Sequence, residues 1–490
     1  MSSHLPDPPT AERDARYQAL RARDRRFDGT FFVGVRTTGI YCRPVCRARL
    51  PQARNCTFHE SAAAAERAGY RPCLRCRPEL APGRSLTDAH ARLANAAFAR
   101  IAEGALNGRS VTDVARELCV SERQLRRAVR AEFGASPVEL AQTQRLLLAK
   151  QLLTDTDLPV ARIAYSSGFA SLTRFNALFL ARYRMSPTRL RRERRARAAP
   201  IVTLRFGYRP PFAWERLLAF LAKRAIPGVE SVTATTYTRS LRIGDHAGWL
   251  RVRHARGEAA LAVEVSDSLV PVLMPVRAAV RRLFDLDAEP EEIAAHFATD
   301  PVLGPVVRAQ PGLRLPGCAD AFEVAVRGVL GQQVSVAAAM TLAGRLTAAL
   351  GEPLADAPDG LTHVGVSAAR LAATDAGRIA GLGMPLARAR TLVALAAAIH
   401  AGDVGLAPSA DPGAVIAALR RIPGIGSWTA EYMAMRGLHW PDAFPAADAG
   451  VRNALGGAGA ATATRLAEAW RPWRAYAVIH LWESLSPRSR

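Results

Sequence analysis

The spacing of hydrophobic and polar positions predicts helices in the middle of the chain. Apolar residues recur there every three or four positions, which is the period of an amphipathic helix. Two of these helical runs repeat at an offset of 50 residues, and they end at Pro137 and at Pro187. Each follows a shorter amphipathic helix, for which Thr112 and Gly168 fit a helix cap and a turn. The pattern therefore predicts two helix-turn-helix units joined by a long helix at residues 140–153.

After residue 200 the pattern changes to the alternation expected of short strands. Such stretches occur at residues 201–206, 232–242, 249–254 and 260–265, with a helical stretch near residues 214–224. From Val276 onward the chain is rich in alanine and is again helical in pattern. These changes predict a small α+β subdomain that is followed by helical lobes.

A tight turn between two helices is predicted at the sequence Ile-Pro-Gly-Ile-Gly that begins at Ile422. Pro423 fixes one backbone angle, while Gly424 and Gly426 permit a close approach and a positive φ. Glycines at such a turn also expose backbone N–H groups at a helix N-terminus, which can hold a DNA phosphate. This is the helix-hairpin-helix way of binding DNA.

Aromatic and acidic side chains follow the turn. Trp428 and Tyr432 are four residues apart, so both rings lie on one helical face. Asp448 stands at the start of the next helical run, where its carboxylate can face whatever those rings hold, and it also fits a helix N-cap. Asp442 is the less favoured carboxylate, because it is nearer the hairpin.

The charge of the chain indicates a polyanionic partner. The formal net charge is +23 and the pI is near 10.9, and most of the excess lies in residues 1–199. Lys150 and Lys223 are the only lysines, so nearly all the basic groups are arginines. The polar N-terminus lacks the apolar core of a signal peptide, and no stretch is long enough to cross a bilayer, so we expect a cytoplasmic protein without a membrane partner.

Four of the seven cysteines form two close pairs. Three residues separate Cys42 from Cys46, and two separate Cys73 from Cys76. In a reducing compartment such pairs indicate metal ligands, and four thiolates suit one tetrahedral Zn²⁺ ion. Four unrelated cysteines are the alternative. An iron–sulfur cluster is not expected in the C-terminal part, because Cys318 stands there alone.

The flanks of these cysteines resemble the N-terminal domain of the Ada protein. They read VRTTGIYCRPVCRAR from Val35 and GYRPCLRCRP from Gly69. The resemblance implies that Cys42 is both a zinc ligand and the nucleophile that takes a methyl group from a DNA phosphotriester. Zinc keeps the sulfur as the reactive thiolate, and Arg43, Arg47 and Arg49 are expected to contact phosphates. A purely structural zinc site is the open alternative.

The middle segment resembles the AraC-type DNA-binding domain. Its second unit carries the signature GFxSxxxFxxxF from Gly168 to Phe179. The exposed starts of the second helices supply the candidate DNA contacts, which are Glu122, Arg123, Arg126, Thr173 and Arg174. Several of these side chains could instead contact only phosphate.

The segment from Ile201 to Trp482 resembles the AlkA-type 3-methyladenine glycosylases of the helix-hairpin-helix family. The resemblance is carried by PPFAW at Pro210, LFDL at Leu283, GLRLPG at Gly312, VLGQQVS at Val329 and PWRAYAVIHLW at Pro472. It implies that Trp428, Tyr432, Trp482 and Phe220 bind the flipped base, that Gln333 in the helix from Phe322 fills the gap left in the duplex, and that Asp448 is catalytic. Stacked rings favour a cation, so we expect a cationic alkylated purine to be recognised partly by its charge.

The resemblances together predict a multidomain, mainly α protein with α+β parts, in four segments. These are a zinc and methyl-acceptor domain at 10–80, a double helix-turn-helix domain at 84–197, an α+β subdomain at 200–280 and a helix-hairpin-helix glycosylase domain at 281–490. We expect a bacterial repair protein and regulator that binds damaged and promoter DNA, with RNA polymerase as a further partner and the nucleoid as its location. Because Lys223 is the only lysine of the glycosylase segment, no Schiff base and no strand cleavage are expected. The alternative is a transcription regulator whose glycosylase segment binds DNA without catalysis.

Overall fold

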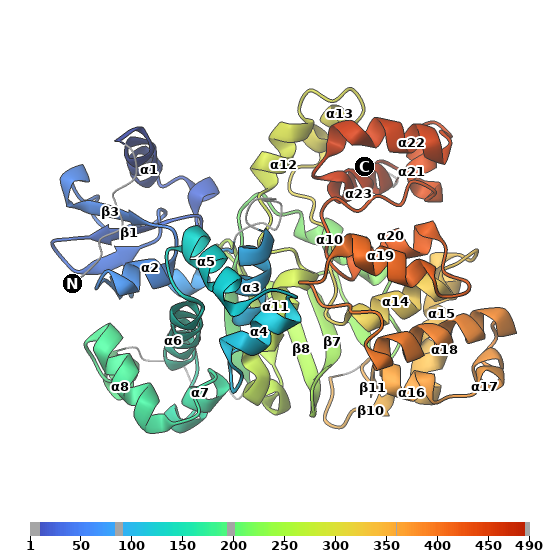
Figure 1. Ribbon diagram of the computed structural model, residues 1–490, viewed down its shortest axis with the longest axis horizontal. Coiled ribbons are helices and arrows are strands. Elements are labelled where there is room, and N and C mark those ends of the chain that lie inside the picture. Colours follow the sequence, from blue (N-terminus) through green and yellow to red (C-terminus); the bar gives the residue numbers. More distant parts are fainter. Residues whose placement is uncertain (1–9, 84–91, 194–200, 359, 486–490) are drawn as a thin grey trace. The chain divides into compact units, whose positions relative to one another are not determined.

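The computed structural model describes residues 10–83, 92–193, 201–358 and 360–485 (Figure 1). The chain divides into two compact units. The first contains Met1–Pro210, Ala255–Ala278 and Leu286–Ala288, and the second contains Pro211–His254, Ala279–Asp285 and Glu289–Arg490. The expected boundaries at residues 84, 197, 200 and 490 lie outside the described residues.

The first unit begins with a small four-stranded sheet in the order β3-β1-β2-β4. β1 pairs antiparallel with β2 and with β3, whereas β2 and β4 are parallel, with Tyr41 opposite Pro72. The elements are α1 (Thr10–Ala22), η1 (Arg25–Phe27), β1 (Phe32–Val35), β2 (Ile40–Cys42), η2 (Ala53–Asn55), β3 (Cys56–His59), α2 (Ala62–Arg67), β4 (Arg71–Pro72) and η3 (Pro78–Leu80). The parallel pair matters for function, because it brings the ends of two strands to the same edge.

Helices form the next part of the first unit, as the hydrophobic period predicts. They are α3 (Arg92–Ala102), α4 (Val111–Glu117), α5 (Glu122–Phe133), α6 (Pro137–Asp155), α7 (Val160–Ser166), α8 (Leu172–Tyr183) and α9 (Pro187–Glu193). α6 is the predicted long connecting helix, and the turn at Gly168 has a φ of +86°. The predicted cap at Thr112 is wrong. Ser110 caps α4 by accepting the Asp113 N–H, because its side chain precedes the first helical residue, whereas Thr112 lies inside the helix.

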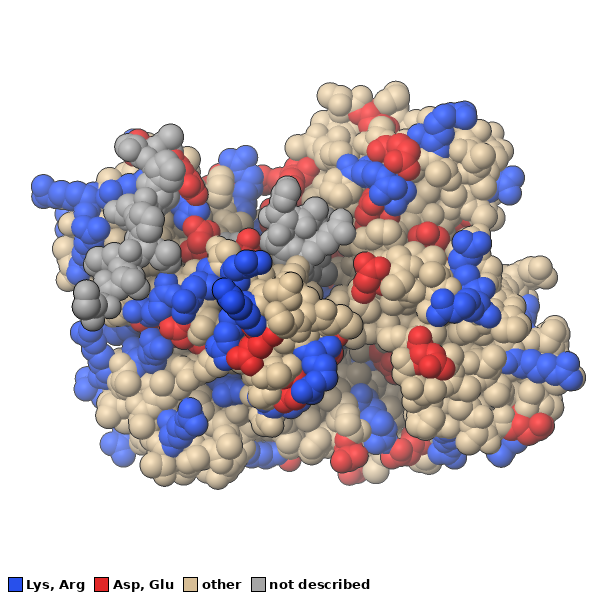
Figure 2. Space-filling model, viewed as in Figure 1, with Lys and Arg blue, Asp and Glu red and all other residues tan. Residues whose placement is uncertain are grey.

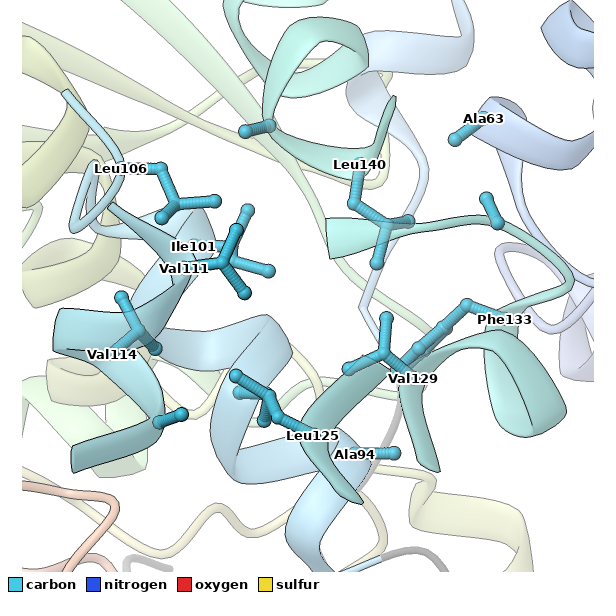
Figure 3. Close-up of a cluster of buried hydrophobic side chains, with 14 residues drawn as sticks. Ala63, Ala94, Ile101, Leu106, Val111, Val114, Leu125, Val129, Phe133 and Leu140 are labelled. Atoms are coloured by element: carbon cyan, nitrogen blue, oxygen red, sulfur yellow. The ribbon is translucent and has the colours of Figure 1, made fainter. Parts of the chain in front are cut away.

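A hydrophobic core lies between these helices (Figure 3). Ile101 of α3, Val114 of α4, Leu125 and Val129 of α5 and Leu140 of α6 are at most 2% exposed and belong to one cluster. The buried residues of this cluster recur every three to four positions along α3 and α5, as at Ala94, Ala97 and Ile101 and at Leu125 and Val129, which explains why these helices bury one face. The same unit also contains β5 (Val202–Gly207), β9 (Ala260–Val265), η4 (Asp267–Val272) and residues 273–278 of α11 (Leu273–Leu283), and β5 pairs antiparallel with β9.

The second unit combines a short antiparallel segment with many helices. β7 pairs with β6 and with β8. The elements are α10 (Trp214–Ala222), β6 (Glu230–Val232), β7 (Thr236–Ile243), β8 (His246–His254), α12 (Pro290–Phe297), α13 (Leu303–Ala309), α14 (Ala321–Leu330), α15 (Val336–Leu350), β10 (Glu352–Pro353), β11 (His363–Val364), α16 (Ala368–Ala372), α17 (Ala376–Ala380), α18 (Leu386–Ala401), α19 (Pro412–Arg420), α20 (Ser427–Arg436), α21 (Ala449–Ala454), α22 (Ala460–Ala467), η5 (Glu468–Trp470) and α23 (Arg474–Ser484).

The mainly α architecture with α+β parts matches the predicted fold class, with one correction in a helix. Gln333 was expected inside the helix from Phe322, but α14 ends at Leu330 and Gln333 lies in the following turn with a φ of +55°. Glycine at position 331 favours this ending, because it has low helix propensity. Among the described residues no helix is both long and apolar enough to cross a membrane.

Candidate functional site

The four paired cysteines meet at one edge of the small sheet in the first unit. Cys42 ends β2 and Cys73 follows β4, so the parallel pairing of these strands places the two residues side by side. The Cys73 N–H donates to the Tyr41 carbonyl at 3.0 Å. Tight turns then bring Cys46 and Cys76 to the same place, and the four Sγ atoms all lie within 4.8 Å of one another.

This arrangement fits a tetrahedral zinc ion. Zn–S bonds of about 2.3 Å put the sulfurs of a four-cysteine site about 3.8 Å apart, which is compatible with the observed cluster. Backbone N–H groups of Arg43 and Arg75 also point to the sulfurs of Cys76 and Cys73, both at 3.4 Å. Such donors stabilise thiolate charge. The residues present therefore suit a divalent cation that prefers sulfur.

The protonation of the four thiols is strongly coupled. A hydrogen bond with the Cys46 thiol raises the pKa of Cys42, whereas the Cys42 thiol lowers the pKa of Cys46 to about 7 and also lowers that of Cys73. Four sulfurs this close cannot all be ionised without a cation, because like charges repel. A bound zinc ion would replace the shared protons and keep each sulfur as a thiolate.

Two of the three arginines expected to contact phosphate near the cluster are exposed. Arg47 and Arg49 point to solvent. Arg43 is different, because its guanidinium pairs with the buried Asp28 and donates to the Cys76 carbonyl at 3.1 Å. The expected phosphate contact of Arg43 is therefore not favoured, since that side chain already has two partners in the fold.

A buried ion pair ties the end of the cysteine segment to the long helix α6. Lys150 Nζ lies 2.5 Å from Glu79 Oε2, and both side chains are at most 1% exposed. Lys150 also donates to the Cys73 carbonyl at 3.4 Å, and Arg77 contacts Glu79 at 3.0 Å. The cysteine cluster and the helical part of this unit thus share a polar core.

The candidate DNA contacts of the helix-turn-helix units lie at the starts of α5 and α8. Arg123, Arg126, Thr173 and Arg174 are exposed. Arg126 pairs with Glu122 at 2.6 Å within α5, and Glu122 also accepts from Thr112. Figure 2 shows acidic groups among the basic groups over α4 and α5. Arg126 and Glu122 therefore form an ion pair with each other in the protein alone. DNA would have to break this ion pair to contact Arg126 fully.

The predicted hairpin turn lies between α19 and α20 in the second unit. Gly424 has a φ of +89°, and a Cβ there would lie 2.1 Å from Thr391 Oγ1, so only glycine fits. Gly426 is the N-cap of α20 with a φ of −87° and open space around it. The positive φ expected of Gly426 is therefore not observed. Its exposed backbone leaves room for a close approach from outside the protein.

The Asp448 carboxylate contacts the indole N–H groups of both Trp428 and Trp482. It caps α21 by accepting the Val451 N–H at 2.9 Å through Oδ1. The same oxygen accepts from Trp482 Nε1 at 2.7 Å, and Oδ2 accepts from Trp428 Nε1 at 3.0 Å. A carboxylate has about four acceptor positions. Three of them are used here, so the carboxylate is fixed while one position on Oδ2 stays available.

The aromatic rings form two near-parallel pairs. Trp428 and Tyr432 have centroids 5.5 Å apart with planes at 17°, and Phe220 and Trp482 have centroids 6.2 Å apart with planes at 16°. The ion pair between Arg216 and Glu483, at 2.7 Å, holds α10 beside α23 and so brings Phe220 to Trp482. All four predicted aromatic residues and Asp448 thus lie in one region of the second unit.

The two neighbouring glutamines have different environments. Gln332 Nε2 donates to the Gly424 carbonyl at 2.8 Å and to Thr429 Oγ1 at 3.0 Å, so its amide supports the hairpin. Gln333 is exposed and has the positive φ that ordinary residues avoid. The backbone there directs an exposed amide outward, as a residue that enters DNA would require.

Asp442 has a structural environment. It accepts from Arg474 Nε at 2.7 Å and from Arg471. This pairing leaves Asp448 as the carboxylate beside the rings.

Sequence reasoning missed three residues of this region. Gln332 supports the hairpin, and Arg224 and Arg436 lie against Phe220, with Cζ atoms 3.8 and 5.0 Å from the ring centroid. Arg224 is four residues after Phe220, and Arg436 is four residues after Tyr432. The spacing of one helical turn was the signal that could have found both arginines.

Three known families match parts of the chain, and the third match includes Phe220 but ends before the hairpin and Asp448. The family described as "Metal binding domain of Ada" matches residues 15–79, the family "Helix-turn-helix domain" matches residues 114–193, and the family "AlkA N-terminal domain" matches residues 203–320. The cysteine cluster lies inside the first match, and the exposed starts of α5 and α8 lie inside the second.

One curated relative matches nearly the whole chain, and others match parts of it. A "Probable bifunctional transcriptional activator/DNA repair enzyme AlkA" from Mycobacterium tuberculosis is 41% identical over 96% of both chains. The "DNA-3-methyladenine glycosylase 2" of Escherichia coli is 39% identical over 56% of this chain and 95% of its own. A solved "3-methyladenine dna-glycosylase from Archaeoglobus fulgidus" shares the fold, with a TM-score of 0.50 at 21% identity, over 57% of this chain and 96% of its own. The chain therefore belongs to the family of bifunctional transcriptional activators and DNA repair enzymes of the AlkA type.

Proposed function

We propose that the chain is a DNA-3-methyladenine glycosylase that hydrolyses the bond between an alkylated base and its sugar. The observation that supports this most is the Asp448 carboxylate, which two indole N–H groups hold beside the aromatic residues. A base must leave the duplex before this chemistry can reach it. The hairpin glycines would hold the backbone, and Gln333 would fill the gap that the flipped base leaves.

In the proposed reaction the base leaves with the electron pair of the glycosidic bond. An alkylated cationic purine thereby becomes neutral, which makes it a good leaving group. Positive charge develops on the sugar, and the fixed Asp448 carboxylate stabilises that charge. A water molecule then bonds to the sugar carbon and loses a proton, which leaves an abasic site.

We propose that the glycosylase does not cut the strand. Strand cleavage of this kind needs an amine that forms a Schiff base with the sugar. The only lysine after residue 150 is Lys223, which is exposed at the end of α10. Borohydride trapping of a covalent complex with damaged DNA would contradict this proposal.

We propose a second repair reaction at Cys42. Its sulfur would bond to the methyl carbon of a DNA methylphosphotriester, while the bond from that carbon to the phosphate oxygen breaks and its electron pair stays on the oxygen. One zinc ion, held by Cys42, Cys46, Cys73 and Cys76, supplies thiolate character to the sulfur. The methyl group then stays on the protein, so each chain reacts once. No iron–sulfur cluster is part of the proposal.

We further propose that the helix-turn-helix units bind promoter DNA and act with RNA polymerase in the bacterial cytoplasm, on nucleoid DNA. Arg49 near the zinc site and Arg123, Arg126, Thr173 and Arg174 on the helices are the proposed contacts. The proposed division of labour follows four segments, at residues 10–80, 84–197, 200–280 and 281–490. Methylation of Cys42 would lower the negative charge of the zinc site and so weaken its repulsion of phosphate.

The proposal is tested by the release of bases from methylated duplex DNA, with abasic sites counted by alkaline cleavage. Wild type should release 3-methyladenine, and Asp448→Asn should not. Asp375→Asn is the matched control, because Asp375 caps α17 through the Arg378 N–H at 3.0 Å and lies outside the aromatic region. If wild type binds DNA but releases no base, the chain is a regulator with a non-catalytic glycosylase fold.

The methyl-transfer proposal needs a separate measurement. After incubation with DNA that carries methylphosphotriesters, mass spectrometry should find one methyl group, on Cys42 alone. Methylation of another cysteine would assign the nucleophile elsewhere. Absence of any methylated cysteine, in protein with its zinc bound, would make the site structural.

A further inference from the structure

The Phe220 ring already carries two cations in the protein without DNA. Arg224 Cζ lies 3.8 Å from the ring centroid and 5.8 Å from that of Trp482, while Arg436 Cζ lies 5.0 Å from Phe220. The sequence predicted that these rings would favour a cationic base. With two guanidinium groups in place, the attraction of Phe220 for a third cation is largely offset by their repulsion.

The two arginines are held differently. Arg436 is buried, and its guanidinium donates to the carbonyls of Pro316 and Gly317, the latter at 3.2 Å. Arg224 has a fixed main chain, because Arg327 Nη1 donates to its carbonyl at 2.9 Å. Among the described residues, the one hydrogen bond of its guanidinium is a long one, 3.4 Å, to the Phe220 carbonyl. The backbone of Arg224 is thus anchored, while most of its side-chain N–H donors have no hydrogen-bond partner in the part of the chain that the structure describes.

Arg327 is itself held by a buried network. It pairs with Glu230 at 3.4 Å and with Glu323 at 3.1 Å, and Arg239 pairs with Glu323 at 2.9 Å. All four side chains are at most 8% exposed. Removing one member would leave a buried charge unpaired, which is strongly unfavourable. The network therefore fixes the place from which the Arg224 side chain extends.

No carboxylate lies within ion-pair distance of Arg224 in the part of the chain that the structure describes. Burial lowers the pKa of Arg224 to about 10, so the group remains a cation at neutral pH. Asp448 and Tyr432 favour the charge of Arg224 from a greater distance, but burial outweighs them, and a half-buried guanidinium is costly unless its N–H groups find acceptors. A ligand that supplies hydrogen-bond acceptors to Arg224 would offset this cost of burial.

The position of Arg224 beside Phe220 determines where a ligand must place its hydrogen-bond acceptors. A guanidinium is planar, and its five N–H donors lie in its plane. The Arg224 Cζ atom lies 3.8 Å from the Phe220 centroid, so the guanidinium lies against that ring. Phe220 and Trp482 are parallel to within 16°. Because Arg224 lies near both rings, a base held against them would present its edge atoms close to the Arg224 donors.

We propose that Arg224 is a specificity-determining residue that donates hydrogen bonds to ring nitrogen or carbonyl acceptors at the edge of the flipped base. The proposal rests on the glycosylase function proposed above. Its consequence concerns the class of lesion. A neutral base with free edge acceptors gains charge-assisted hydrogen bonds from Arg224, whereas a cationic base gains fewer and is repelled by the same charge.

The test compares two lesions in otherwise identical duplex oligonucleotides under single-turnover conditions. Hypoxanthine is the neutral base with edge acceptors, and 7-methylguanine is the cationic base. Arg224→Met should lower the excision rate of hypoxanthine about 10- to 100-fold, which is the effect of losing a hydrogen bond to a charged group. The excision of 7-methylguanine should stay the same or become faster.

Lys223→Met is the matched control, because it removes one exposed positive charge from the adjacent residue and should leave both rates unchanged. Arg224→Lys keeps a charged donor and should restore part of the hypoxanthine activity. If the methionine variant does not fold, Arg224→Gln replaces it, because glutamine keeps a polar end without charge. This variant should also lower the ratio of the hypoxanthine rate to the 7-methylguanine rate.

Two outcomes would overturn the proposal. An equal fall in both rates means that Arg224 acts on the DNA backbone or on folding. A rise of the hypoxanthine rate relative to that of 7-methylguanine means that Arg224 is an obstacle that the base displaces. Failure of the wild type to release either base would instead refute the proposed glycosylase function.

Discussion

The hydrogen bond from Trp482 to Asp448 allows a sharp test of how the carboxylate works. Trp482→Phe removes the indole N–H that lies 2.7 Å from Oδ1 and keeps a ring to stack on Phe220. The carboxylate then retains two donors, the Val451 N–H at 2.9 Å and Trp428 Nε1 at 3.0 Å. The substitution therefore loosens the carboxylate without removing its charge.

The expected size of the effect follows from these contacts. A hydrogen bond to a charged group contributes about 1.5–3 kcal/mol. Because two of the three donors to Asp448 remain, we expect the lower end, which is about a 10-fold loss in the rate of excision. Asp448→Asn removes the charge that stabilises the sugar and should cost about 100-fold or more.

The assay is single-turnover release of 7-methylguanine by the two single variants and the double variant. If Trp482 acts through Asp448, the double variant should be no slower than Asp448→Asn alone, because the charge that this hydrogen bond positions is already absent. Trp470→Phe is the control, since Trp470 donates to Asp300 at 2.8 Å in an equivalent bond away from the rings. Losses that simply multiply would refute the reasoning and would mean that Trp482 acts on the base.

Three further predictions concern stability. Gly424→Ala should lower the free energy of unfolding of the second unit, measured in urea, by about 1–3 kcal/mol, because alanine would have to adopt the positive φ of residue 424. Gly426→Ala should change that free energy by no more than about 0.5 kcal/mol but should weaken DNA binding in a gel-shift assay. Lys150→Met leaves the buried carboxylate of Glu79 with one partner fewer and should cost about 3 kcal/mol by chemical denaturation, of which a second change of Glu79 to Leu should recover part. Burial lowers the pKa of His480 from 6.5 to about 4, so the free energy of unfolding should fall by about 3 kcal/mol as the pH drops from 6.5 to 4. His480→Gln should lack this pH dependence when melting is measured across that range. If the variant keeps the same pH dependence, other groups cause it.

Much of the fold could be predicted because local patterns decide it. The repeat at an offset of 50 residues corresponds to α5 and α8, and the long connecting helix predicted at residues 140–153 corresponds to α6. The errors are at element ends. Thr112 was expected to cap a helix that Ser110 caps, and Gln333 was expected inside a helix that ends at Leu330. Several residues near a helix end have similar propensities, so tertiary contacts select the final boundary.

The candidate site could be predicted only where a motif carries it. The cysteine pairs and the pair Trp428 and Tyr432 are visible in the sequence, because their spacing is itself the signal, whereas Phe220 and Trp482 were predicted only from the resemblance to AlkA-type glycosylases. The role of Gln332 depends on the approach of α14 to the hairpin, and the position of Arg224 depends on a network that joins β6, β7 and α14. Such contacts join residues that are 84 to 103 positions apart. They change the expected chemistry, since Phe220, which sequence alone describes as part of a site for a cation, already has two cations against its ring. Recognition of damage in this protein should therefore depend on edge acceptors as well as on charge.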